Sequence, residues 1–213
     1  GGQPAPPRPT GSLLQIPPVT PPRLKVGVDV PWVTSWSQEK QGGVGPCPTV
    51  DGRVAALQTW KPGVGKPLYS RNHLRRQSDS VRAMLCPMCG EPTPEGDRWS
   101  QTGQFHAAGV LRARGFGHAL PVDLDDDRVL LDAGSIAPLH MRCALTSLQR
   151  CPHLGAMPDH ELKGFPPAWV VAPLYVEARQ PITGRAVAAV TSLQLLGVTG
   201  DRDPGWRARL SQD

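Results

Sequence analysis

The first third of the chain has an apolar pattern typical of short strands. Residues 24–36 are rich in Val and partly alternate, which predicts a strand interrupted at Pro31. A second short strand is expected over 53–60, directly after the Asp51-Gly52 turn. Residues 41–48 are rich in Gly and Pro, so we expect a loop there.

Two segments have the pattern of helices. Residues 70–85 contain no Pro or Gly, and Ser70 could cap their N-terminus, which predicts a helix with an incomplete apolar stripe. Residues 139–151 form a second expected helix, which ends before Pro152. The first helix is basic through Arg71, Arg75, Arg76 and Arg82.

The second half of the chain has weaker patterns. Residues 98–138 contain five Gly and are expected to form an irregular inserted loop, in which Val129-Leu130-Leu131 could be a strand. The composition of residues 168–177 favours a strand. Residues 186–196 fit a strand or a helix, because their periodicity does not separate the two.

Composition predicts one small domain between two tails. Eight Pro in the first 22 residues indicate a disordered, Pro-rich tail over 1–23, and residues 200–213 form a polar tail. Residues 24–199 are then a single domain. Hydrophobic residues make up only 39% of the chain, so we expect a small core supported by a staple such as a metal ion.

The net charge of +5 is unevenly distributed. Residues 1–85 carry eleven Lys/Arg against four Asp/Glu, whereas residues 86–213 carry twelve against fourteen. A basic first part can attract DNA or RNA, and the basic helix could lie along a phosphate backbone. A solvated basic face is the alternative interpretation.

Five Cys, no basic leader with an apolar run, and no apolar stretch of 18 residues indicate a cytoplasmic protein without a membrane segment. In a reducing compartment, clustered Cys are metal ligands more often than disulfides. The cysteine spacing therefore becomes the most informative chemical signal in the chain.

Two ligand pairs predict one structural zinc ion. Cys86 and Cys89 form a CxxC knuckle, in which Gly90 permits the tight turn. His140 and Cys143 form an HxxC pair at the start of the second helix, where residues three apart share a face. Together they make a Cys3His set, a common closed structural site.

Two further residues lie near this pattern. Cys151 is interpreted as a buried thiol, and His153 could replace His140 as the fourth ligand. The 50 residues between Cys89 and His140 imply an inserted loop. The predicted fold is therefore α+β: a treble-clef-like knuckle and helix, stabilised by zinc, with short strands.

Several blocks resemble a group of uncharacterised proteins from actinobacteria, Streptomyces especially, and from their phages. The match covers much of residues 30–175 in ordered blocks. Members usually have a second CxxC where this chain has HxxC, and because His and Cys both ligate zinc, the resemblance implies a metal role. It implies a source but no activity. The blocks are VPWVTSW at Val30–Trp36, Cys86–Cys89, Pro138–Ala144, Ser147 and Cys151–Leu154.

Binding is favoured over catalysis, because four protein ligands leave zinc no open position and no GxSxG, P-loop, GxGxxG or HExxH motif occurs. Nucleic-acid binding through the four arginines is the first hypothesis. A protein-interaction or assembly adaptor using the Pro-rich tail and residues 24–36 is the second. The third is an HNH-like, metal-dependent nuclease with His106, His118 or His153 as a base.

Overall fold

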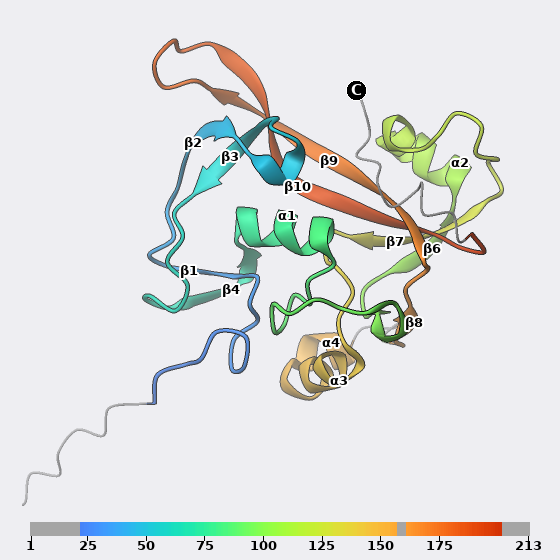
Figure 1. Ribbon diagram of the computed structural model, residues 1–213, viewed down its shortest axis with the longest axis horizontal. Coiled ribbons are helices and arrows are strands. Elements are labelled where there is room, and N and C mark those ends of the chain that lie inside the picture. The colour runs from blue at the N-terminus through green and yellow to red at the C-terminus, as the bar shows by residue number, and fades with distance from the viewer. Residues whose placement is uncertain (1–21, 157–160, 202–213) are drawn as a thin grey trace, which may run out of the picture.

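The computed structural model describes residues 22–156 and 161–201. The predicted Pro-rich tail over 1–23 and the polar tail over 200–213 therefore lie almost entirely outside the described residues. The described part is a mixed α+β fold with more strand than helix, arranged around one central sheet (Figure 1). No helix in residues 22–156 or 161–201 is long and apolar enough to cross a membrane.

The central sheet has six strands. They run in the order β2-β3-β10-β7-β6, and β9 pairs with β10 as well. All pairings are antiparallel except that of β3 with β10. The strands are β2 (Gln41–Pro46), β3 (Val54–Gln58), β6 (Gln104–Ala107), β7 (Val129–Gly134), β9 (Ala168–Arg179) and β10 (Ala186–Val198).

The β9–β10 hairpin is the longest feature of the sheet, and its turn projects beyond the rest of the fold (Figure 1). The predicted strand over 168–177 is confirmed, and the ambiguous segment 186–196 is a strand. Both faces of β10 are buried: Leu193 and Leu195 join the core beneath α1, while Leu196 and Val198 join a second core beside α2. A strand buried on two faces loses its alternation, which explains the ambiguity.

Helix α1 (Leu74–Ala83) lies across one face of the sheet (Figure 1). It begins four residues later than Ser70, so the predicted cap is wrong. Ser70 belongs to β4 (Pro67–Asn72), which pairs with β1 (Thr34–Trp36). The actual cap is His73, whose Nδ1 accepts a hydrogen bond from the backbone N–H of Arg76.

Residues 24–48 also differ from the prediction. Only β1 is a strand within 24–36, and residues 26–30 form a turn instead. Residues 41–46, expected as loop, form the edge strand β2, where a Cβ at Gly42 or Gly43 would meet no atom within 4 Å. The predicted strand over 53–60 is confirmed as β3.

The prediction of an irregular loop over 98–138 is wrong, although the strand considered at Val129-Leu130-Leu131 is confirmed as part of β7. This segment supplies β6 and β7 to the central sheet. Gly103 allows a close approach there, since a Cβ would lie 2.9 Å from Leu131 Cδ1. The remaining elements of the segment are β5 (Trp99–Ser100), α2 (Ala108–Leu111), the short helical turns η2 (Glu95–Asp97) and η4 (Gly117–Ala119), and the π-helical turn η3 (Arg112–Phe116).

The last elements surround the cysteines. Helix α3 (Met141–Arg150) confirms the second predicted helix, and α4 (Pro152–Ala156) follows it directly. β5 pairs with β8 (Lys163–Gly164) and places the chain before α3. The turn η1 (Pro48–Val50) lies near α1.

Candidate metal centre

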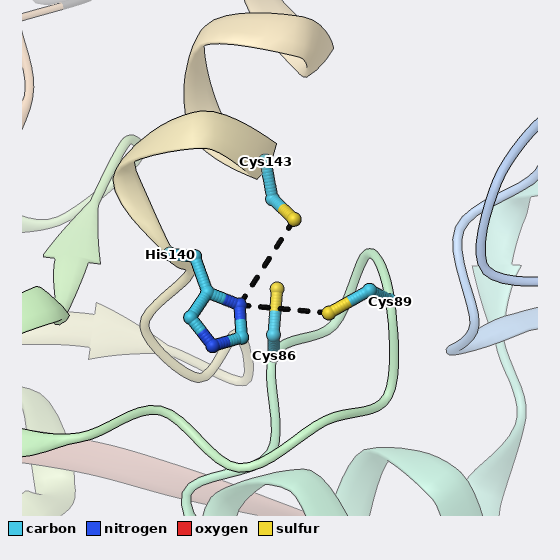
Figure 2. Close-up of side chains that lie close together, drawn as sticks. All are labelled: Cys86, Cys89, His140 and Cys143. Atoms are coloured by element: carbon cyan, nitrogen blue, oxygen red, sulfur yellow. Dashed lines mark hydrogen bonds between the residues drawn. The ribbon is translucent and has the colours of Figure 1, made fainter.

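Four side chains from two distant segments converge below the sheet. Their ligand atoms, three thiol sulfurs and one imidazole nitrogen, all lie within 4.8 Å of one another (Figure 2). The residues are Cys86, Cys89, His140 and Cys143, which is the full set expected from the spacing. Among the described residues, no other His, Cys, Asp or Glu joins this group.

The knuckle is held by its own backbone and by a neighbouring segment. Gly90 N–H donates to Cys86 O at 2.8 Å, and Cys86 N–H donates to Glu91 O at 2.8 Å. Gly90 has a φ of +81°, and a Cβ there would lie 2.8 Å from Trp32 Cγ. Trp32 N–H in turn donates to Met88 O at 2.9 Å. Only Gly fits this position, for conformation and for space.

The start of α3 is placed by three contacts from the segment that follows the knuckle. Trp99 and Leu139 exchange two backbone hydrogen bonds of 2.9 Å, directly before His140. Asp97 Oδ1 accepts from Met141 N–H at 2.7 Å and so caps the helix. These hydrogen bonds place the HxxC pair beside the knuckle.

His140 is oriented as a ligand. Its Nε2 donates to Pro92 O at 3.0 Å, which leaves the Nδ1 lone pair directed at the cluster. Nδ1 lies 3.5 Å from Cys89 Sγ and 4.0 Å from Cys143 Sγ (Figure 2). With metal–ligand bonds of about 2.0–2.3 Å, a tetrahedral zinc site has ligand–ligand distances of roughly 3.5–3.8 Å. The cluster is close to that size.

The electrostatics of the cluster call for a cation. Burial raises the pKa of the Cys86 thiol. Burial and the negative charge of Cys86 and Cys89 thiolates raise the pKa of Cys143 to about 12. Three thiolates at this distance repel one another, whereas a bound divalent cation compensates their charge and favours the deprotonated form. The donor set therefore fits a bound metal.

The alternative ligands lie elsewhere. His153 is exposed on α4, and Cys151 caps the end of α3. Cys151 is half-buried, not buried as expected. The other histidines considered as a nuclease base are also outside the cluster: His106 contacts Arg114 at 3.2 Å, and His118 Nδ1 lies 3.0 Å from Gly115 O.

The four arginines do not form a common basic face, which corrects the first binding hypothesis. Arg76 is fully buried and cannot reach a phosphate in this fold. Arg71 lies in β4, not on the helix. The remaining two are ion-paired, Arg75 with Asp79 at 2.8 Å and Arg82 with Asp51 at 3.1 Å.

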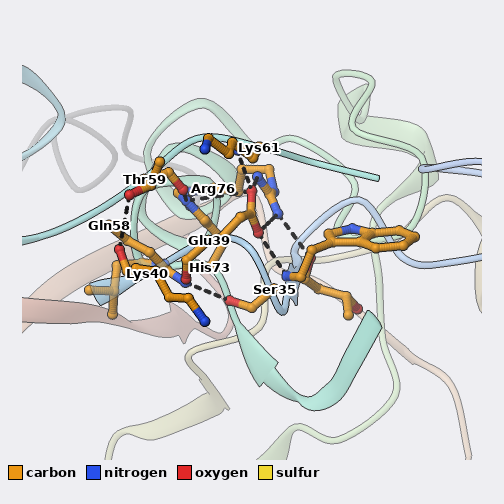
Figure 3. Close-up of polar contacts among 11 residues, drawn as sticks. Ser35, Glu39, Lys40, Gln58, Thr59, Lys61, His73 and Arg76 are labelled. Carbon is orange, nitrogen blue, oxygen red and sulfur yellow. Dashed lines mark hydrogen bonds and ion pairs between the residues drawn. The ribbon is translucent and has the colours of Figure 1, made fainter. Parts of the chain in front are cut away.

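Arg76 is instead the centre of a buried polar network (Figure 3). Its two terminal nitrogens donate to the two Glu39 carboxylate oxygens at 2.7 and 2.8 Å, and one also donates to Thr34 O at 2.9 Å. Burial alone would raise the pKa of Glu39, but the hydrogen bonds and charge of Arg76 outweigh it and lower that pKa. The pair ties α1 to the turn after β1.

His73 completes the network. Nδ1 accepts the Arg76 N–H at 3.3 Å, and Nε2 therefore donates to Thr59 O at 3.0 Å. Both nitrogens are used by the neutral ring. Burial, followed by the charge of Arg76, lowers the pKa of His73. The polar composition of residues 70–77 does not indicate burial. The one available signal is that the helix has too few apolar residues to cover its core face, so polar side chains must lie there.

Comparisons with protein-family models, with curated proteins and with solved structures found no match for this chain. The candidate metal centre therefore rests on its geometry and donor chemistry alone.

Proposed function

We propose that the chain binds one structural zinc ion through Cys86, Cys89, His140 and Cys143. The observation that carries the proposal is the convergence of four ligand atoms within 4.8 Å, with the His140 ring fixed by its bond to Pro92 O. Zinc favours this Cys3His set in tetrahedral geometry. The knuckle and the helix start form a treble-clef-like arrangement, with the hairpin replaced by the longer segment 98–138.

Cobalt substitution tests the coordination directly. We expect absorption typical of tetrahedral cobalt together with thiolate-to-cobalt charge-transfer bands of a three-sulfur site. Cys143→Ser should weaken those bands by about one third, whereas Cys151→Ser should leave them unchanged. A five- or six-coordinate spectrum would show that solvent reaches the ion, and would favour a catalytic metal instead.

A binding role follows from a closed site, because four protein ligands leave no position for water or substrate. Zinc would then act on function by holding the knuckle against α3. An actinobacterial or phage origin stays a prediction, and so does a cytoplasmic location. The adaptor hypothesis involves residues 1–36, of which 1–21 lie outside the described residues.

Nucleic-acid binding is a second candidate, at a different surface from the one predicted. Trp60 is 50% exposed, and its ring is held by Arg76, 5.1 Å from the ring centroid, and by the edge of His73. Exposed lysines on the two turns beside it supply positive charge. We call this set the Trp60 surface; it consists of Lys40, Trp60, Lys61 and Lys66.

The turns that carry these lysines are joined by backbone bonds. Thr59 N–H donates to Lys40 O at 2.9 Å, and Ser37 N–H donates to Lys66 O at 2.9 Å. Residues 59–72 contain no Asp or Glu, and Glu39 is neutralised by Arg76. A fixed aromatic ring among unpaired lysines suits stacking with single-stranded bases.

Anisotropy of a labelled thymidine dodecamer tests this candidate. Binding should weaken steeply with salt, and Trp60→Ala should weaken it at every salt concentration. Lys61→Gln should reduce the slope of log K against log salt by about 0.7. Arg185→Gln, on the projecting hairpin, is the control. Binding that is absent at low salt, or indifferent to Trp60, refutes the candidate.

A further inference from the structure

A cavity of about 530 Å³ adjoins the metal centre. It lies between the knuckle, α3 with α4, and the segment that leads into β1. Its volume falls within the roughly 300–1,000 Å³ of typical small-molecule sites. None of the four metal ligands lines it, so it is a separate feature of the fold.

The floor of the cavity is apolar and recessed. Val33, Pro87, Met88 and Leu139 line it, and all four are buried residues. Pro87 and Met88 are the two residues between Cys86 and Cys89. The buried polar residues Thr34, Ser80 and Gln101 line the cavity as well, so its lining is mainly rather than wholly apolar. A molecule that fills the floor must still present a mainly apolar body, since burying a polar group there without a partner is unfavourable.

The mouth of the cavity favours a negative group. Arg150, in the last turn of α3, reaches across to donate one hydrogen bond to Val28 O at 2.8 Å. A guanidinium has five N–H groups, so further donors remain for a ligand. His153 lies exposed at the same rim. The one acid among the lining residues, Asp29, has Oδ2 engaged by Lys25 N–H at 2.8 Å.

We propose that this cavity binds a small amphipathic molecule with an apolar body and a carboxylate or similar anionic head group. The body occupies the floor beside Met88, and the head group accepts hydrogen bonds from Arg150 and His153. Guanidinium–carboxylate bonds are charge-assisted and bring selectivity as well as affinity. The site is distinct from the metal centre and from the Trp60 surface.

The cavity is coupled to the metal centre through its walls. Pro87 and Met88 of the CxxC knuckle form one part of its wall, and Ser147 and Arg150 of α3 form another. The N-cap of α3 is His140, and its first turn carries Cys143. A metal ion that joins these elements fixes the distance between the walls. Loss of the metal ion should therefore weaken binding of the small molecule, even though the molecule does not contact the ion.

Three probes of equal length test the proposal: decanoate, decanol and decylammonium, all below their aggregation concentrations. Isothermal titration calorimetry gives affinity and stoichiometry, and the ¹³C-methyl resonance of Met88 reports the site. We expect one decanoate per chain, with decanol about tenfold or more weaker and decylammonium weaker still. Zinc content is measured on the same samples, so a failure of the zinc proposal is recognised separately.

Two variants and one control decide the interpretation. Arg150→Gln should reduce decanoate binding to the level of decanol, whereas Arg142→Gln, exposed on the same helix but outside the cavity, should change nothing. Ile136→Trp, at a partly exposed lining position, should block all probes. The proposal is overturned if no probe saturates, if Arg150→Gln binds decanoate like the parent, or if Ile136→Trp still binds it.

Discussion

Two polar clusters join distant parts of this chain, and they do so by different physical means. The metal centre links the knuckle at 86–89 to α3 across 50 intervening residues. The buried pair of Glu39 and Arg76 links the turn after β1 to α1. The pair supplies both charges itself, whereas the cysteine cluster lacks a positive partner until an ion enters.

This difference decides what each cluster does when it is disturbed. An ion pair fails when one partner is removed, because the other charge stays buried without compensation. The cysteine cluster fails when the ion is removed, even though every residue is still present. The comparison thus predicts that one part of the fold depends on metal in the solution and the other does not.

Removal of the metal should have the largest effect. A structural zinc ion contributes several kcal/mol, and about 5 kcal/mol corresponds to a fall in Tm of roughly 10–20 °C for a chain of this size. A strong zinc chelator and the substitution Cys86→Ser should both produce this fall in calorimetry. Added chelator should have no further effect on Cys86→Ser. An unchanged Tm in the chelator would contradict a structural role.

Breaking the ion pair should come next. Arg76→Met leaves Glu39 charged and buried, which should lower the free energy of unfolding by about 3–5 kcal/mol in urea titrations. Adding Glu39→Gln should restore part of that loss. The exposed pair offers a matched control, since Arg75→Met should cost at most about 1 kcal/mol. Equal losses from the two arginine substitutions would refute the distinction.

The network should also respond to pH, by a smaller amount. The pKa of His73 is lowered by folding, so below about 6.5 the unfolded chain takes up a proton that the folded chain refuses. The stability that neutral His73 provides is present above that pH and is lost as pH falls through the folded pKa. The pKa of Glu39 is also lowered, so its contribution to stability is complete above about pH 4.5 and is lost only below that pH.

His73→Asn isolates this contribution, because Asn can cap α1 without titrating. The difference in unfolding free energy between parent and variant should shrink as pH falls from 7 to 5. Taking the difference cancels the acid sensitivity of the metal centre, which both proteins share. A difference that stays constant over this range would show that His73 does not carry the effect.

The smallest effects should come from the residues beside the metal centre. His153→Ala and Cys151→Ser should leave zinc content unchanged and alter stability by no more than about 0.5 kcal/mol, because neither side chain joins the cluster. Elemental analysis and a urea titration check this. Loss of zinc in His153→Ala would place that residue in the coordination shell.

The metal centre could be found from sequence because ligand spacing is a local pattern. A CxxC pair has two residues between its thiolates, and the HxxC residues lie three apart on one helical turn. Both spacings depend on local geometry alone and not on the rest of the fold. The ion pair has no such signature. Nothing in the spacing of Glu39 and Arg76 indicates contact, so the sequence predicts Arg76 on the basic surface with Arg71, Arg75 and Arg82.

The fold was predictable in part for the same reason. The two helices and the strands at 53–60 and 168–177 follow from local composition. The role of residues 98–138 does not, because β6 and β7 pair only through long-range contacts with β10 and each other. Ser70 likewise is not the predicted helix cap, because it belongs to β4, which pairs with β1.

The most direct test of the account is elemental analysis of the purified parent protein, Cys86→Ser and His140→Ala, with the unfolding transition of each recorded alongside. The account predicts one zinc per chain in the parent, and loss of zinc together with a fall in Tm of roughly 10–20 °C in both variants. A purified parent protein without zinc, or zinc retained at one per chain in both variants, would contradict it.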